Sequence, residues 1–578
     1  MTTHKLGVKA NILLSSVFGP YATDDEFGSR KVNPMELYHN QVTRAQGVFS
    51  LRMFHQSFGL HMIQANIEAP CTLLDFPDLE RFIKEIKEHV YDIVGISSII
   101  PNVGKVHKMC QLIRQYQPNA TIVVGGHVAN LDGHVGLSLA DHVVKGDGIS
   151  WFRRFLGQDE FAPIRHPALY SATTTRIMGQ SLKNKKGDTA AILIPSAGCP
   201  MGCNFCSTSN FFGGKGKFIN FYETGDELYS VMLQLEEKLK TKSFFILDEN
   251  FLFHRKRALR LLELMEEHGK DWSMSVFSSA RVLKSYTIEQ LVRLGISWVW
   301  MGLEGQNSQY QKLSGVDTRD LVMQLQSHGI RVLGSSIIGL ENHTPDNIKD
   351  IIDYAVSHNT VFHQFMLYTA VPGTPLHKEL KESGRVLSEN EFALADTHGQ
   401  YRFNHRHPNF SSNQEEPLLM DAFNRDFEIN GPSLLRLIQV LLKGWQYYKD
   451  HSDVRIRNRY AREVKPLRST YAGAIWAMTK WYSNDKHMEI KTKELLMEIY
   501  KTFGVVTRLI APIIGRVILS SMKKEEKRYA QSFNFEPSTV YQDKVDFVAA
   551  KNEGLEKDSD VSIEGKRELV FTTIENQF

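Results

Sequence analysis

The sequence is poor in cysteine and nearly neutral in charge. Five cysteines in 578 residues are too few, and odd in number, for a disulfide framework, which indicates a reducing compartment. The formal net charge is +3 and the basic residues are dispersed, so the composition gives no indication of nucleic-acid binding. We therefore expect a cytoplasmic protein whose partners do not include nucleic acid.

Long apolar runs are also absent. No uninterrupted apolar stretch reaches the length of a transmembrane helix. The opening residues, MTTHKLGVKANILLSS, lack the ordered basic, apolar and small-residue regions of a signal peptide. The length predicts about three domains.

The first part of the chain alternates strand and helix patterns. Apolar, β-branched runs indicate five strands, at 10–18, 70–77, 91–99, 120–130 and 140–148. Strand, helix, strand at this spacing predicts right-handed βαβ units and a parallel sheet. We expect an α/β protein that begins with a Rossmann-like domain over 1–165, with its ligand at the carboxyl ends of the strands.

The rest of the chain divides into four parts. We expect a polar linker over 166–188, a barrel domain over 189–400, a helical domain over 401–535 and a charged tail over 536–578, either mobile or a small appendage. Helical patterns separate six strand patterns, at 190–196, 243–250, 272–279, 298–305, 331–340 and 363–371. This alternation predicts a partial (β/α)6 barrel.

Three of the five cysteines, Cys199, Cys203 and Cys206, fall within eight residues in PSAGCPMGCNFCSTS. Structural zinc normally takes four ligands, often as two pairs, and no second pair is present. A simple CxxC redox site does not account for all three. Three thiolates can also hold an iron–sulfur cluster, which leaves one iron open to bind a small molecule.

The CxxxCxxC motif after the first barrel strand, with Phe205 before the last cysteine, resembles the radical S-adenosylmethionine (radical SAM) superfamily. The resemblance implies that the three cysteines hold a [4Fe–4S] cluster whose open iron binds SAM. One electron then cleaves the sulfonium C–S bond, and the 5′-deoxyadenosyl radical takes a hydrogen atom from the substrate. A low-potential flavodoxin or ferredoxin is the implied electron donor.

Later strands carry features that resemble the superfamily's SAM contacts. LDENF ends the second strand, and because it departs from the commoner Gly-Gly-Glu form, Asp248, Glu249 and Asn250 are all candidates for the SAM amino group. The resemblance also implies contacts to the SAM carboxylate, ribose or methionine part from Ser279, Arg281 and Glu304. Each feature alone is explained by a helix cap or a turn, but their order after the cysteines favours a SAM site. No catalytic residue is assigned.

The motifs DIVGISSIIPN, VVGGHVAN and VVKGDG resemble the cobalamin-binding domain that precedes the barrel in one group of radical SAM enzymes, which is class B methyltransferase-like. The resemblance implies corrin or nucleotide-tail contacts from Ser97, Ser98, Gly125, Gly126, Gly146, Asp147 and Gly148. The DxHxxG motif that supplies a lower axial histidine is missing, since the first loop reads SSVFGPYATDDEFG. This departure fits cobalamin held without a histidine ligand, and it also fits an empty domain. We expect His127 near the corrin rather than on cobalt.

The C-terminal stretch VVTRLIAPIIGRVILSSM places one apolar stripe on a helix over 505–522, interrupted by Arg508 and Arg516. It is too polar to span a bilayer. One interpretation is ordinary core that covers the barrel. The other is a peripheral contact with a membrane surface, or the wall of a tunnel for an apolar substrate.

The expected function is cobalamin-dependent C-methylation of an unactivated carbon in an apolar, lipid-like or natural-product substrate. The alternative is a radical cyclase or C–C-bond-forming enzyme on a lipid or tetrapyrrole, with or without cobalamin in its cobalamin-type domain. A non-enzymatic cobalamin or cluster sensor would leave the SAM contacts without a role. The other two cysteines, Cys71 and Cys110, cannot hold a second cluster, which argues against methylthiotransferases.

Overall fold

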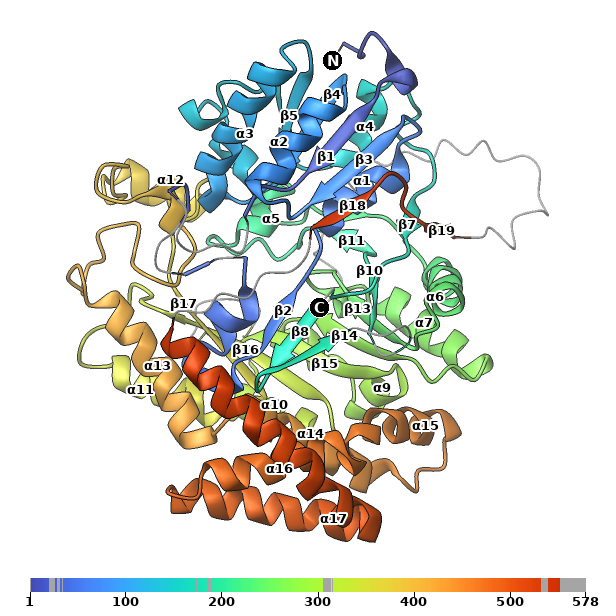
Figure 1. The fold of residues 1–578 in the computed structure, drawn as a ribbon, viewed down its shortest axis with the longest axis vertical. Helices are drawn as coiled ribbons and strands as arrows, with labels where there is room; N and C mark the ends of the chain where they lie inside the picture. The colour runs from blue at the N-terminus through green and yellow to red at the C-terminus, as the bar shows by residue number, and fades with distance from the viewer. Residues whose placement is uncertain are drawn as a thin grey trace.

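The fold has an α/β domain, a barrel and a helical region arranged in that order along the molecule (Figure 1). The structure is a computed structural model. It describes residues 2–19, 26–28, 32–33, 35–172, 174–183, 187, 189–304, 313, 315–531 and 539–550.

The N-terminal sheet has the strand order β18-β3-β1-β4-β5-β6. The strands are β1 (Ile12–Ser15), β3 (Cys71–Asp75), β4 (Ile93–Ser97), β5 (Thr121–Gly125), β6 (His142–Val143) and β18 (Val540–Gln542). Helices α2 (Leu79–Glu88) and α3 (Val103–Tyr116) share a core with one face, and α1 (Phe58–Asn66) and α4 (Gly148–Phe155) with the other. Because both faces are covered, the parallel strands are mostly apolar, with few polar residues such as Ser15 and Asp75, which confirms the Rossmann-like prediction.

Six parallel strands in sequence order form the second sheet, which confirms the partial barrel. They are β10 (Ala191–Leu193), β13 (Ser243–Ile246), β14 (Ser273–Phe277), β15 (Ile296–Gly302), β16 (Arg331–Ile338) and β17 (Phe362–Leu367). The helices between and after them are α5 (Ser207–Phe211), α6 (Gly225–Leu239), α7 (Arg255–Glu267), α8 (Ala280–Leu283), α9 (Ile288–Arg293), α10 (Thr318–Ser327), α11 (Ile348–Ser357) and α12 (Pro375–Glu382). The sheet is open, with β10 and β17 at its edges.

Segments expected to be a linker and a tail contain strands. Residues 166–188 include most of β7 (Arg165–Pro167), together with β8 (Thr174–Ile177) and β9 (Gln180–Lys183). β8 and β9 form a sheet with β2 (Arg52–Phe54). In the described part of 536–578, β18 extends the N-terminal sheet and β19 (Phe547–Ala549) pairs with β7. The partners of these short strands are distant in sequence, so local patterns do not predict them.

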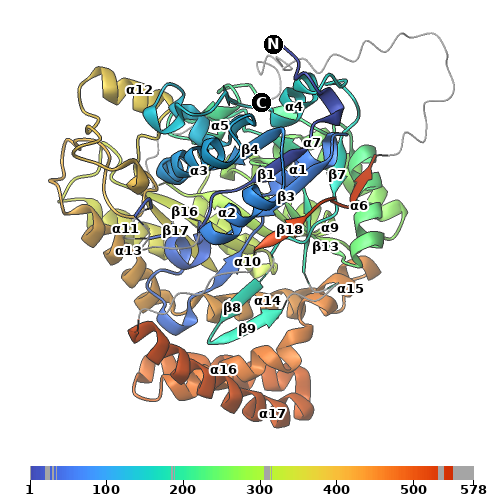
Figure 2. The same cartoon turned by 45° about the horizontal axis from the view of Figure 1, so that its top comes forward.

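The helical region lies under the barrel, on the side away from the N-terminal sheet (Figures 1 and 2). It consists of α13 (Glu415–Asn430), α14 (Ser433–Tyr448), α15 (Val454–Glu463), α16 (Thr470–Trp481) and α17 (Lys486–Ala530). The two helical parts of α17 meet at Gly504, whose φ is +80°. Gly515 of α17 lies against α16, where an added Cβ would come within 2.4 Å of the Trp476 ring. The close approach fixes which side of α17 faces inward.

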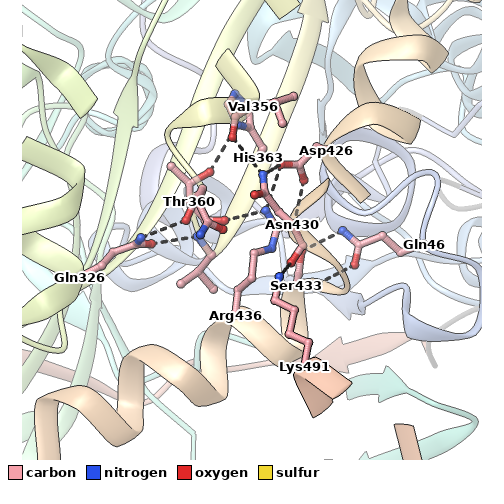
Figure 3. A network of polar contacts seen from close by, with 12 residues as sticks. Gln46, Gln326, Val356, Thr360, His363, Asp426, Asn430, Ser433, Arg436 and Lys491 are labelled. Carbon is pink, nitrogen blue, oxygen red and sulfur yellow. Dashed lines mark hydrogen bonds and ion pairs between the residues drawn. The ribbon is translucent and has the colours of Figure 1, made fainter. Parts of the chain in front are cut away.

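A buried polar network holds α13 and α14 against the start of β17 (Figure 3). Arg436 forms an ion pair with Asp426 at 2.8 Å and donates a hydrogen bond of 2.7 Å to the backbone oxygen of Thr360. Gln46, far upstream in sequence, donates to the Ser433 hydroxyl at 2.8 Å. Because a buried charge is costly unless it is paired, this network holds α13 and α14 in one position.

Candidate active site

The cysteine loop runs between β11 (Ser196–Ala197) and β12 (Ile219–Asn220), which pair with each other. Cys206 is the N-terminal cap of α5 (Ser207–Phe211), and its sulfur accepts a hydrogen bond from the Ser209 amide. The Ser209 hydroxyl donates to the Cys199 backbone oxygen at 2.6 Å. The Asn210 side-chain amide donates to the backbone oxygens of Cys203 (3.2 Å) and Cys206 (2.7 Å). Ser209 and Asn210 therefore set the shape of the loop, a role the sequence reading did not assign.

Gly202 allows the loop to fold back on itself. Its φ is +68°, and an added Cβ would come within 2.7 Å of the Lys215 backbone. A side chain at this position would therefore push the cysteines out of place.

All three cysteines line one cavity of about 510 Å3. In the part of the chain that the structure describes, no group of three or more His, Cys, Asp or Glu side chains could hold a single metal ion. The three thiols thus do not converge as zinc ligands would, whereas a four-iron cluster spaces its thiolate ligands more widely. Burial raises the pKa of Cys199 to about 12, and binding to iron would supply the charge that ionises this thiol. The residues present fit a cluster.

The two carboxylates after β13 have different surroundings. Asp248 is buried, pairs with Arg257 at 2.8 Å and accepts a hydrogen bond of 2.6 Å from the Ser196 hydroxyl. Glu249 lines the cavity, and its side chain is exposed there. The protein around the cavity partly desolvates the Glu249 carboxylate and so raises its pKa to about 7, and the nearby Asp248 carboxylate adds to this rise. Glu249 is therefore the carboxylate that faces the cavity, whereas Asp248 supports the turn.

The other predicted SAM contacts divide in the same way. Asn250, Ser279 and Glu304 line the cavity with the cysteines. The Asn250 side-chain oxygen accepts hydrogen bonds from the Ser278 hydroxyl (3.1 Å) and the Ser279 amide (3.2 Å), which joins the ends of β13 and β14. Arg281 lies on α8 and is not among the residues that line the cavity.

The predicted corrin-binding residues gather at the carboxyl ends of β4, β5 and β6. Ser98 donates its amide hydrogen to the Gly125 backbone oxygen at 3.2 Å. Gly126 has φ +78°, and an added Cβ would lie 2.5 Å from the Ser98 backbone oxygen and 2.8 Å from the Ser97 hydroxyl, so the two turns pack directly together. The turns at Ser97-Ser98 and Gly125-Gly126 are therefore in direct contact at the carboxyl ends of β4 and β5.

The third motif, Gly146-Asp147-Gly148, begins α4. Asp147 caps this helix by accepting hydrogen bonds from the amides of Ile149 (2.9 Å) and Ser150 (3.1 Å). An added Cβ at Gly148 would come within 3.0 Å of the Ile63 side chain, which shows a close packing contact with α1. Asp147 and Gly148 thus have structural roles, and their contacts with a corrin stay a prediction.

His127 connects the two domains. It lines the same cavity as the cysteines, together with Ile99, Ile100 and Pro101 from the loop after β4. Its ring lies 4.8 Å from the Phe211 ring of α5, measured between centroids. Burial lowers the pKa of His127 to about 4, so the imidazole is neutral. The face of the N-terminal domain that would hold a corrin therefore adjoins the cysteine loop.

Sequence reasoning missed a polar chain on the inner barrel wall. The Trp300 indole donates to the Ser335 hydroxyl at 2.8 Å, which donates to the Gln364 side-chain oxygen at 2.9 Å. The Gln364 amide then donates to the Gln41 side-chain oxygen at 3.2 Å. All four residues line the cavity. Strand alternation could have placed Trp300, Ser335 and Gln364 on one face, but Gln41 comes from a distant short helical segment, Tyr38–Val42, with no local signal.

A second cavity, of about 540 Å3, lies further down the barrel. It is lined mainly by apolar side chains that alternate along the strands, including Phe245, Trp298, Leu333 and Phe362, and by residues of α14, α16 and α17. Along β15, Trp298 lines the lower cavity, Gly302 the upper one, and Trp300 both. The barrel interior therefore holds two cavities that share Trp300 as a wall.

Comparisons with known proteins match both folded domains. The family model of the B12 binding domain matches residues 46–156, and that of the Radical SAM superfamily matches residues 193–355. The chain is 24% identical over 392 residues to a bacteriochlorophyllide d C-8(2)-methyltransferase of Chlorobaculum tepidum, covering 64% of this chain and 83% of that one.

Two further relatives and one solved structure show the range of the similarity. The chain is 24% identical to a hopanoid C-2 methylase of Rhodopseudomonas palustris (34% of this chain, 38% of that one). It is 22% identical to an anaerobic magnesium-protoporphyrin IX monomethyl ester cyclase of Cereibacter sphaeroides (55% and 58%). The structure of the methyltransferase TsrM from Kitasatospora setae, with cobalamin and a [4Fe-4S] cluster bound, aligns with TM-score 0.48 and 14% identity, over 78% of this chain and 99% of that one.

Proposed function

Because the chain belongs to the radical SAM superfamily and carries a B12-binding domain, we propose that it is a cobalamin-dependent methyltransferase that acts on an unactivated carbon of an apolar, lipid-like substrate. One observation carries the proposal. The three cysteines, Glu249 and the loops of the N-terminal domain line one cavity, and that cavity shares Trp300 with an apolar cavity.

In this proposal, Cys199, Cys203 and Cys206 hold a [4Fe–4S] cluster, and the turns around Ser98 and Gly126 hold the corrin. When bound, the cluster supplies the electron that cleaves SAM, and cobalamin supplies the methyl group. The protein's part is to bring both groups and the substrate into one enclosed space and to exclude water from it.

Glu249 has a direct role in holding SAM. Its carboxylate faces the cavity, and an ammonium group is the partner that an acid in such a place binds most strongly. Asn250 and Ser279 lie beside it and carry hydrogen-bonding groups for the rest of the ligand. Asp248 acts only through the turn, because its Oδ2 accepts hydrogen bonds from Arg257 and Ser196 and its Oδ1 accepts one from the Asn250 amide.

The electron donor in this proposal is a low-potential flavodoxin or ferredoxin, and the protein acts in the cytoplasm in contact with a membrane surface. Support for an apolar substrate comes from the lower cavity, in which few polar groups could bind a polar one.

Methyl transfer and cyclisation are separated by one experiment. The reconstituted protein is incubated under anaerobic conditions with a low-potential reductant, methyl-labelled SAM and detergent-dispersed lipid or tetrapyrrole extract. We expect 5′-deoxyadenosine together with labelled methyl groups in the lipid fraction. A product with a new ring and no label would replace this proposal with the cyclase, for which relatives also exist. The Cys203→Ala variant is the control and should give neither product.

A further inference from the structure

One side of α17 is apolar and uncovered. Val505, Val506, Leu509, Ile513 and Val517 are 60–71% exposed and fall on one side of the second helical part. We call these five residues the outer face of α17. The interpretation of the whole 505–522 stripe as ordinary core is therefore wrong, because only its inner edge, such as Ile518, is buried.

The opposite side of α17 packs on the protein. Ala511 and Ile518 are buried there, and Gly473 and Gly515 allow α16 and α17 to approach closely. Among the helices of the described residues, α17 alone is long and apolar enough to cross a membrane by length and composition. A helix that is packed along one side and apolar on the other is suited to lie on a bilayer rather than to cross it.

The charge around the outer face has one sign. Residues 500–524 contain Lys501, Arg508, Arg516, Lys523 and Lys524 and have no Asp or Glu. Arg508 and Arg516 are exposed on the same part of α17 as the outer face. Basic side chains that flank an apolar helix face complement the anionic headgroups of a lipid surface.

The outer face is continuous with the lower barrel cavity. Val517 belongs to both, and its neighbours Ile514 and Ile518 also line the cavity. From there the cavity extends past Trp298 to Trp300, which also lines the cavity that contains the cysteines. Apolar surface thus extends from the exposed helix to Trp300, the wall that this cavity shares with the cavity lined by the cysteines.

We propose that the outer face of α17 docks on an anionic bilayer and that the lower cavity takes the hydrocarbon part of a membrane lipid from it. The reacting end of the lipid then passes Trp300 and meets the cluster cavity from below. The choice of substrate rests on the function proposed above, whereas docking does not depend on it.

Vesicle flotation with the full chain tests the docking step. The vesicles are phosphatidylcholine alone, or phosphatidylcholine with phosphatidylglycerol. We expect binding to the anionic vesicles, weakened about tenfold or more by the double substitution L509E/I513E. The matched control is Met323→Glu, which replaces an equally exposed apolar residue on α10 and should bind like the parent.

Three results would overturn the docking step. These are no vesicle binding, binding that L509E/I513E leaves unchanged, and equal binding to neutral and anionic vesicles. A dimer that L509E/I513E dissociates, without vesicle binding, would assign the face to a second copy of the chain.

A fluorescent fatty acid, cis-parinaric acid, tests the cavity. Its fluorescence should rise on binding, and Ala474→Phe, which fills the cavity from α16, should remove most of the rise. Val517→Trp narrows the mouth at an exposed position that tolerates a bulky residue, and it provides a second variant if A474F does not fold. Unchanged probe binding in folded variants would overturn the lipid route.

These binding assays need neither SAM nor cobalamin, so they fail independently of the enzymatic assay. Methyl transfer to detergent-dispersed lipid without vesicle binding would contradict the docking step and leave the proposed function standing. Vesicle and probe binding without methyl transfer would contradict the proposed function and leave the docking step standing.

Discussion

Asp248 and Glu249 are neighbours in sequence, but we expect their amide substitutions to have opposite consequences. Asp248→Asn removes the charge that pairs with buried Arg257, whose guanidinium also donates to Asn220 (3.0 Å) and to the Tyr222 backbone oxygen (2.9 Å). Leaving one partner of a buried ion pair uncompensated costs about 3–5 kcal/mol of folding free energy. Glu249 has no such structural partner among the interactions described above, so Glu249→Gln should leave stability nearly unchanged.

SAM affinity should depend directly on Glu249, whereas Asp248 should affect it only through the shape of the turn. A hydrogen bond to a charged group contributes about 1.5–3 kcal/mol, so E249Q should weaken SAM binding roughly 10- to 100-fold. The assays are chemical denaturation and anaerobic calorimetric titration of cluster-loaded protein with SAM. The double variant D248L/R257M, which replaces the pair by apolar groups, should recover much of the stability that D248N loses.

The reasoning would be refuted if D248N kept its stability and lost SAM binding while E249Q bound SAM normally. That outcome would show that Asp248 contacts SAM and that Glu249 does not contribute to SAM binding.

Three further predictions concern the cluster and the helical region. Cys203→Ala should lower the iron content from about four per chain and abolish 5′-deoxyadenosine formation, as measured by iron assay and chromatography; retained cleavage would contradict the ligand assignment. Arg436→Met should destabilise the protein by about 3–5 kcal/mol in denaturant titrations, because Asp426 is left buried without its partner; an unchanged midpoint would contradict the role of the network. Burial acts to raise the pKa of Glu525, but its hydrogen bonds and ion pair with Arg176 outweigh burial and lower the pKa. The stability that this ion pair contributes is therefore full above the unfolded pKa of about 4.3, and it is lost as the pH falls through the lower folded pKa. Hydrogen exchange should therefore show α17 loosening from β8 and β9 at acid pH, and an Arg176→Met variant that loosens with the same pH profile would contradict this.

The strands and the cysteine ligands could be predicted because their signals are local. Each barrel strand is a short apolar run between helical patterns, and the CxxxCxxC spacing lies within one loop. The fold class and the two domains follow from these patterns.

The choice between Asp248 and Glu249 could not be predicted in the same way. Both residues lie in the turn after β13, and Asp248 is held inside by Arg257, nine residues later on α7, a contact that local sequence does not predict. Gln41 was missed for a related reason, since it comes from a segment distant in sequence and reaches the site by tertiary packing, where it contacts Gln364.

The stripe on α17 shows the limit of periodicity. The pattern predicts an apolar helix face, but how much of that face is covered depends on the crossing with α16, which Gly473 and Gly515 determine. The strands β18 and β19 were missed because each is three residues long and pairs with a strand far upstream in sequence, β18 with β3 and β19 with β7.

The most direct test of the account is the product balance in a single anaerobic reaction with methyl-labelled SAM and membrane lipid. For cobalamin-dependent methyl transfer, we expect 5′-deoxyadenosine, S-adenosylhomocysteine and a lipid with a labelled methyl group to form in equal amounts. Formation of 5′-deoxyadenosine with no labelled methyl group in any lipid would contradict it.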